Sequence, residues 1–406
     1  MNLGRPLASM LACVMLLAAC GSPADEPTGS ADASATASEP PQTRPASPSE
    51  GVSPSAAPSA SDGPFTSWSM AASFDTDPGT TYVTDVTAWD GGFVAIGSAW
   101  EGTAHVTQEM PAIWTSADGE SWEEQTVDLG NDDVSLAGIA TRPDGELLLV
   151  GTIPGTGIVA DQPEPAAVAW VSDDGSAWES VDLPMAEGLP VNSFDHGPMG
   201  YVLGAGGEIW FSADGSEWTQ TYEGASGVVA GDEGFVATIV PPTDSPNTVI
   251  ASADGQTWLS SEPIEGTLLE VAAFGGDWVA TAYVGEPHTI TVWHSTDGLE
   301  WSPVLDVNDL TGPDGPKTGR GLGADAVNGA SVAGGAGYAF VTLTNNHCCA
   351  QMSWNYGVWG SSDGTTWEPV VEGDAFVSSV ASNDDAMVLA GHLRRGEDAA
   401  FWIGDR

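Results

Sequence analysis

The chain has 406 residues and is strongly acidic, with 57 Asp and Glu against 8 Lys and Arg and a formal net charge of −49 at pH 7. This charge argues against binding of nucleic acid and against direct adhesion to anionic lipid, because both carry negative charge themselves. The length would suit two or three ordinary domains, but the repeats described below indicate a single one.

Residues 1–19 have the features of a signal peptide. Arg5 gives a basic start, and the apolar run from Leu7 to Ala19 is too short to span a bilayer. The run ends in Leu17-Ala18-Ala19-Cys20, which resembles the signal of bacterial lipoproteins. The resemblance implies that Cys20 is lipidated, and an ordinary cleaved signal with an incidental Cys is the alternative. We expect an exported protein, lipid-anchored to the outer face of the cytoplasmic membrane or the cell surface.

Residues 20–63 predict a disordered tether. The segment is dominated by Ser, Ala, Pro, Thr, Asp and Glu and has almost no large apolar side chain. Such a composition buries too little surface to offset the entropy of ordering. The tether would hold residues 64–406, the predicted folded domain, away from the membrane.

One peptide, Ser-x-Asp-Gly-x-x-Trp, occurs six times at intervals of 40 to 66 residues. We call each copy a box; the copies begin at Ser116, Ser172, Ser212, Ser252, Ser295 and Ser361. Asp caps such a turn through neighbouring backbone groups, and Gly supplies a positive φ. Apolar runs flank every copy, so each box predicts the turn of a β-hairpin.

A second hairpin precedes each box, and a seventh follows the last one. Each consists of two apolar runs around a turn, near residues 84–97, 136–151, 192–204, 226–238, 269–282, 331–343 and 377–391. A hairpin followed by a box hairpin gives four short antiparallel strands, which is one blade of a β-propeller. The sequence therefore predicts an all-β, seven-bladed propeller.

The seventh blade lacks a box, and the N-terminus supplies its missing strand. Ser67-Trp68-Ser69-Met70 matches the strands that follow the boxes, and Phe401-Trp402-Ile403 matches the strands that precede them. We expect the N-terminal strand to complete the last blade and close the ring. The Trp residues that recur in these two strands are predicted to pack between blades rather than to bind sugars.

The boxes resemble the Asp-box repeat of bacterial neuraminidases, shortened by one residue between Asp and Gly. The resemblance covers most of residues 84–367 and implies the propeller fold. It is weak for function, because the repeat occurs in sialidases, other glycosidases, sorting receptors and photosystem assembly factors.

Strand direction sorts the loops onto two faces of the predicted ring. The boxes and the first-hairpin turns share one face, which we call the box face. The longer loops share the other, the long-loop face, where function is expected to concentrate. In the sialidases that the boxes resemble, the active site also lies opposite the boxes.

The few cations of the predicted domain gather on the long-loop face. Four of them lie in loops of blades six and seven, where guanidinium groups could grip a carboxylate, sulfate or phosphate. The alternative is that these side chains pair with local acids such as Glu397 and Asp398. The candidate ligand-binding cluster is Lys317, Arg320, His347, Trp354, Tyr356, Arg394 and Arg395.

Cys348 and Cys349 follow His347 directly. Exported cysteines oxidise, but adjacent Cα atoms lie ~3.8 Å apart whereas relaxed disulfides need at least ~4.4 Å. We expect a strained vicinal disulfide that stiffens the loop, with a redox or metal role as the alternative. No cofactor or metal ligand is predicted, and the sequence leaves binding of calcium or another metal as an alternative.

Two functions compete. The first is a non-catalytic module that binds a glycan, a small anion or a protein partner. The second is a sialidase-like glycoside hydrolase, which by resemblance needs three arginines from separate blades, a Tyr–Glu pair and an Asp acid. The Arg-Ile-Pro signature is absent, Arg142-Pro143 falls in a box-face turn, and we assign no catalytic residue. We favour the binding module, with a photosystem-factor-like assembly propeller as a further reading.

Overall fold

The computed structural model describes residues 67–75, 80–103, 106–131, 133–155, 164–185, 188–239, 247–285, 289–311, 329–345, 354–393 and 398–405. All of them belong to one compact unit, residues 60–406. Within these ranges, no helix has the length and apolar character needed to cross a bilayer.

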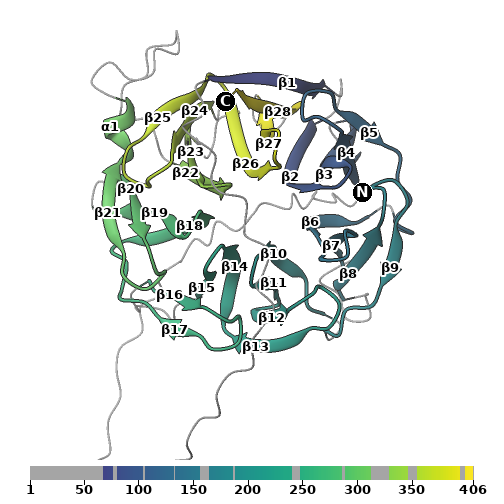
Figure 1. Ribbon diagram of the computed structural model, residues 1–406, viewed down its shortest axis with the longest axis horizontal. Coiled ribbons are helices and arrows are strands. Elements are labelled where there is room, and N and C mark those ends of the chain that lie inside the picture. The colour runs from purple at the N-terminus through teal and green to yellow at the C-terminus, as the bar shows by residue number, and fades with distance from the viewer. Residues whose placement is uncertain are drawn as a thin grey trace, which may run out of the picture. The chain divides into compact units, whose positions relative to one another are not determined.

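Seven four-stranded antiparallel sheets, the blades, surround a common centre (Figure 1). Blades one to three consist of β2 (Thr80–Trp89), β3 (Gly92–Thr103), β4 (Val106–Ser116), β5 (Glu123–Gln125); β6 (Ser135–Thr141), β7 (Leu147–Ile153), β8 (Ala166–Ser172), β9 (Glu179–Val181); and β10 (Val191–Gly197), β11 (Gly200–Ala205), β12 (Glu208–Ser212), β13 (Thr219–Glu223). Blades four and five consist of β14 (Ala225–Gly231), β15 (Gly234–Ile239), β16 (Val249–Ser252), β17 (Leu259–Ser260); and β18 (Thr267–Phe274), β19 (Asp277–Val284), β20 (Thr289–Ser295), β21 (Ser302–Asp306). Blades six and seven consist of β22 (Gly329–Gly335), β23 (Tyr338–Asn345), β24 (Trp354–Ser361), β25 (Glu368–Glu372); and β26 (Ala375–Ser382), β27 (Met387–Leu393), β28 (Asp398–Asp405), β1 (Ser67–Asp75), with the short helix α1 (Val307–Thr311) after blade five.

The chain closes the ring as the sequence predicts. The strand order of the last blade is β1-β28-β27-β26, so the first strand of the propeller pairs with the last. Trp68 lies opposite Gly404, and Phe74 lies opposite Ala399. The prediction of a seven-bladed propeller closed by an N-terminal strand is confirmed.

The core lies between the blades. Seven clusters of buried apolar side chains each join two neighbouring blades, one cluster for every junction of the ring. Trp114 and Trp402 are almost fully buried in two of them. Trp122 of blade one stacks on Phe401 of blade seven, with ring centroids 3.9 Å apart. The recurring Trp residues therefore pack the blades together, which confirms the sequence interpretation.

The boxes form the predicted turns, and in all six copies the Asp carboxylate accepts the backbone N–H two residues further along the chain. In the first copy, the backbone N–H groups of Glu120 and Ser121 donate to Asp118 Oδ1 at 2.9 and 2.8 Å. The N–H of Gly119 donates to Ser116 Oγ at 2.8 Å. The indole of Trp122 donates to the carbonyl of Gly119 at 3.0 Å. The box carboxylate is thus committed to its own turn.

Two constraints act together on each box glycine. Gly255 has a φ of 68°, in the left-handed region that glycine favours. A Cβ at this position would clash with the Phe211 ring of the preceding blade. Similarly, a Cβ at Gly364 would meet the rings of His294 and Phe274. Each of these turns therefore docks on the blade before it, so the boxes contribute to the scaffold.

Candidate binding site in the central channel

The centre of the ring contains a cavity of about 510 Å³. All seven innermost strands (β2, β6, β10, β14, β18, β22 and β26) contribute to its wall. The lining runs from the middle of these strands to the hairpin turns at Asp232, Gly275 and Ala336. Sequence reasoning placed the functional surface on the long-loop face and missed this channel, which extends toward the box face.

The sequence brings acidic side chains into the wall at three innermost strands. Asp85, Asp195 and Glu270 come from β2, β10 and β18 of blades one, three and five, and all three line the cavity. Each of these strands carries a β-bulge, which changes the face to which the following side chains point. The sequence signal for this wall was a charged residue within an otherwise apolar strand. The bulges could not be read from the sequence, so the direction of these side chains was not predictable.

Asp85 connects three blades. Its Oδ2 accepts the backbone N–H of Ile139 in blade two at 2.9 Å. Its Oδ1 accepts the hydroxyl of Ser379 in blade seven at 2.6 Å and the N–H of Val86 at 2.8 Å. The Ser379 oxygen also accepts the N–H of Val86 at 3.3 Å. This carboxylate therefore holds the junction at which the ring closes.

Asp195 and Glu270 form similar bridges to the next blade. Asp195 Oδ2 accepts the N–H of Ala230 in blade four at 3.0 Å, and its Oδ1 accepts the N–H of His196 at 2.7 Å. Glu270 Oε2 accepts the N–H of Val332 in blade six at 2.9 Å. The carboxylates thus satisfy backbone donors that the edge strands leave unpaired. They join blade one to two, three to four and five to six.

The channel shifts the acid–base behaviour of these groups. Burial raises the pKa of Asp195 to about 7 against the lowering effect of its backbone hydrogen bonds, and the charge of Asp85 raises it further. Burial also raises the pKa values of Asp85 and Glu270. Both Asp85 and Asp195 are half-buried and Glu270 is exposed, but that exposed surface lines the cavity rather than the outside of the ring. Desolvation by the surrounding blades therefore dominates.

His196 also lines the cavity, beside Asp195. Its ring stacks on Tyr201 with centroids 5.9 Å apart and planes at 13°. Burial lowers the pKa of His196 to about 4, so the ring is neutral at pH 7. The His196 side chain is half-buried in the channel wall.

The described part of the chain brings no catalytic constellation together in the channel. The oxygens of Asp85 and Asp195 accept hydrogen bonds from the scaffold, which suits a structural carboxylate better than a nucleophile or a general acid. No group of three His, Cys, Asp or Glu side chains in the described ranges could hold a metal ion. What the channel offers a ligand is a set of hydrogen-bond acceptors with negative charge.

Most of the predicted ligand-binding cluster lies outside the described residues. This applies to Lys317, Arg320, His347, Arg394 and Arg395, and also to Cys20, Cys348 and Cys349. Trp354 and Tyr356 belong to β24, of which the structure describes the backbone but not these two side chains. The ends of the elements that flank these segments are described: they are Thr311 of helix α1 and Gly329, Asn345 and Trp354, and Leu393 and Asp398. By strand direction, the strand ends among them lie on the long-loop face, at blades six and seven.

His392, at the end of β27 near this region, is a packed side chain. Its ring stacks on Phe376 with centroids 4.5 Å apart and planes at 12°. Burial lowers the pKa of His392 to about 4, and its Nδ1 is buried without a hydrogen-bond partner among the described residues.

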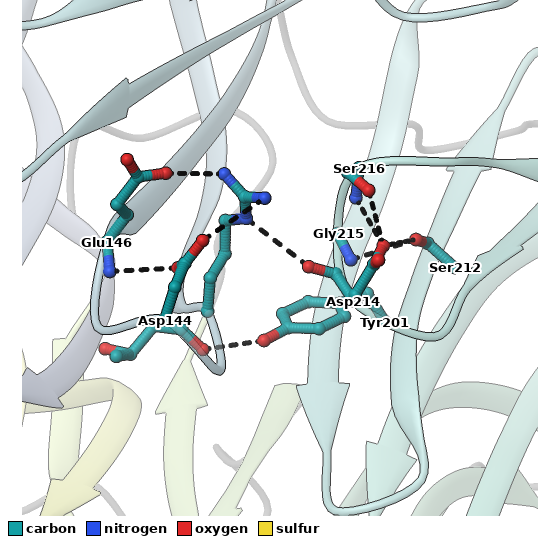
Figure 2. A network of polar contacts seen from close by, with 9 residues as sticks. Asp144, Glu146, Tyr201, Ser212, Asp214, Gly215 and Ser216 are labelled. Carbon is teal, nitrogen blue, oxygen red and sulfur yellow. Dashed lines mark hydrogen bonds and ion pairs between the residues drawn. The ribbon is translucent and has the colours of Figure 1, made fainter.

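Arg142 has a structural role on the box face. Its Nη1 contacts Glu146 Oε2 at 2.6 Å and its Nη2 contacts Asp144 Oδ2 at 3.5 Å. Its Nε donates to the carbonyl of Asp214, in the box of the next blade, at 3.3 Å (Figure 2). Tyr201 donates to the carbonyl of Thr141 in the same network at 2.7 Å. This arginine therefore joins blades two and three, and its guanidinium is engaged by local partners.

Comparisons with solved structures support the fold. A structure titled "YCF48 bound to D1 peptide" superposes with a TM-score of 0.51 at 14% identity, covering 84% of this chain and 96% of that one. The propeller domain of the trilobed protease from Pyrococcus furiosus gives 0.47 at 10% identity, covering 80% and 96%. A Trypanosoma rangeli sialidase gives 0.40 at 11% identity, covering 80% and 54%. No protein-family model and no curated protein matches the chain. At 14% identity, the likeness to the first of these structures is one of fold.

Proposed function

We propose that this chain is an exported lipoprotein whose propeller is a non-catalytic binding module. Cleavage after residue 19 and lipidation of Cys20 would attach it to the outer face of the membrane. The tether of residues 20–63 would present the propeller to a glycan, a small anion or a protein partner. The ligand would bind on the long-loop face, against Lys317, Arg320, His347, Trp354, Tyr356, Arg394 and Arg395.

The placement of the flanking strand ends supports this site. The segments that contain the four cations of the cluster are inserted at blades six and seven, which contact each other directly through β22 and β26. A positive cluster in a chain of net charge −49 would attract an anionic group that the rest of the surface repels. Arginine pairs such as Arg394 and Arg395 suit carboxylate, sulfate and phosphate groups.

The state of the described carboxylates favours binding over catalysis. A retaining glycosidase of the common type, unlike a sialidase with its Tyr nucleophile, needs two carboxyl groups about 5 Å apart, one as an acid and one as a nucleophile. In the channel, Asp85, Asp195 and Glu270 come from three different blades and each accepts a backbone N–H of the next blade. These carboxylates act as connections between blades.

A binding screen tests the proposal. The mature chain would be titrated with sulfated, phosphorylated and carboxylated glycans and with their neutral counterparts. We expect saturable binding of an anionic member, weakened at least tenfold by Arg394→Ala combined with Arg395→Ala. Arg44→Ala, which removes a cation from the predicted tether, is the matched control and should bind like the wild type. Equal binding by the double variant and the wild type would contradict the proposed site.

A further inference from the structure

The closing strand β1 lies on the outer rim of the ring beside β28, and its register fixes its direction (Figure 1). Ser67 lies opposite Asp405, and Asp75 lies opposite Asp398, where β28 begins after the loop that joins it to β27. That loop is on the long-loop face, so β1 begins at the box face and ends at the long-loop face. The chain that precedes Ser67 therefore enters the propeller at the box face.

A pull between that preceding chain and a ligand held on the long-loop face runs along the axis of β1. The N–H···O bonds of an antiparallel pair are perpendicular to the strands, so such a pull acts on all of them together, in shear. β1 and β28 form eight residue pairs. A pull between Ser67 and Asp405 acts differently, because these two residues are paired at the same end of the ladder. It would open the pairs one after another.

Two aromatic side chains hold β1 against sliding. Trp68 packs edge-to-face on Phe340 of blade six, with ring centroids 5.7 Å apart. Phe74, near the other end of the strand, lies between the rings of Trp114 in blade one and Phe401 in blade seven, with centroids 6.1 and 6.2 Å away. A slide along the axis of β1 has to withdraw both rings from packed junctions, and this exposes apolar surface to water.

The β-bulge between Met70 and Ala72 also opposes sliding. A regular antiparallel pair can shift by two residues and form an equivalent set of hydrogen bonds, because its side chains alternate with a period of two. The bulge places one extra residue in β1, so a single shift cannot restore the pairs on both of its sides. The strand is therefore held in one register.

We propose that β1 is a force-bearing strand, which keeps the ring closed when the chain before Ser67 and a ligand on the long-loop face are pulled apart. This role rests on the proposed function, because the pull needs an anchored tether and a bound ligand. The length of the strand supports it: as the structure describes them, the outer strands of the other six blades have two to five residues, against nine in β1.

Single-molecule force spectroscopy of the mature chain tests the proposal. It needs neither a lipid nor a ligand, so its result is independent of the binding screen above. One handle is attached at residue 20 in both arrangements. The second is attached either at Thr126, an exposed residue in the connection that leaves β5 on the long-loop face, or after residue 406, next to Asp405. We expect the first rupture in the Thr126 arrangement to need at least twofold greater force.

Variants in β1 show whether this strand carries the force. Phe74→Ala should lower the rupture force in the Thr126 arrangement, whereas Met70→Ala, at a side chain that is 52% exposed, should leave it unchanged. With the handle after residue 406, the first rupture should lengthen the chain by on the order of 30 Å, the length of nine extended residues.

Equal rupture forces in the two arrangements would overturn the proposal, and so would an unchanged force in the Phe74→Ala variant. If that variant does not fold, the comparison of the two arrangements in the wild-type chain still decides.

Discussion

At the scale of single residues, the pKa values of acidic side chains shift in opposite directions in the box turns and in the channel. In the box turns, backbone N–H groups stabilise the charged form: the pKa of Asp174 falls to about 2 because it accepts hydrogen bonds from Ala177 and Ser176. In the channel, burial disfavours the charged form, and the pKa of Asp195 rises to about 7. The box carboxylates therefore stabilise the fold when ionised, whereas the channel carboxylates carry their charge at a cost.

The pH dependence of stability follows from Asp195. Its folded-state pKa lies above the unfolded value of 3.8, so its contribution is fully present below about pH 4 and is lost as the pH rises through 7. Asp195→Asn should therefore be more stable than the wild type at pH 8, by on the order of 1–3 kcal/mol. The gap should shrink as the pH falls and close near pH 4. Urea unfolding of both proteins from pH 8 to 4 measures it.

Asp85 and His196 line the same cavity as Asp195, and the charge of Asp85 also raises the pKa of Asp195. The pH profile of the Asp195→Asn variant therefore has to be compared with that of a control variant. Glu217→Gln, at an exposed box position, is the control and should leave the pH profile unchanged. A stability gap that is constant with pH would show that Asp195 does not titrate as described.

The roles of single residues were the least predictable part of the molecule from its sequence. Asp195 and Glu270 belong to no repeated motif, and β-bulges in β10 and β18 shift the alternation of side chains along those strands. Alternation alone could not reveal that these carboxylates meet the N–H groups of the next blade. The anion cluster around Arg320 and Arg394 stays a prediction, because those residues lie outside the described ranges.

At the scale of elements, the regular blade was predictable because each strand carries its own local signal. The box fixes the turn between the third and fourth strands, and the recurring Trp residues mark the strands on either side. The same Trp spacing identified the N-terminal strand as the missing strand of the last blade. β1 pairs with β28 over eight residue pairs, from Ser67 to Asp75 with a bulge between Met70 and Ala72. The closing strand is therefore a full member of its sheet.

The contribution of β1 to closure can be measured within that strand. Phe74 lies between the rings of Trp114 and Phe401, with centroids 6.1 and 6.2 Å away, so it packs across the junction of blades one and seven. Phe74→Ala should lower the free energy of unfolding by about 2 kcal/mol, less than for a fully buried Phe. The matched control is Met70→Ala, since Met70 is 52% exposed in the same strand and should change stability by less than about 0.5 kcal/mol.

Denaturant unfolding followed by Trp fluorescence provides the comparison. Equal effects of the two substitutions would mean that the packing of β1 at the junction contributes little to closure.

At the scale of the whole molecule, the seven blades form a closed scaffold. The boxes, the interblade Trp residues and the channel carboxylates all hold blades together. Asp85, Asp195 and Glu270 each accept a backbone N–H of the next blade. Loops on a rigid scaffold generally vary without disturbing the elements that they connect. This division supports a binding module, in which the loops determine the ligand and the propeller keeps them in place.

Assay of the mature chain with a fluorogenic sialoside tests this conclusion most directly, because it asks whether the propeller performs the chemistry of the enzymes that its boxes resemble. If the protein is a binding module, it should release no fluorophore above the rate in buffer. This should hold at every protein concentration at which a known sialidase, assayed in parallel, gives measurable release. Release of fluorophore that is abolished by Arg320→Ala would contradict the account.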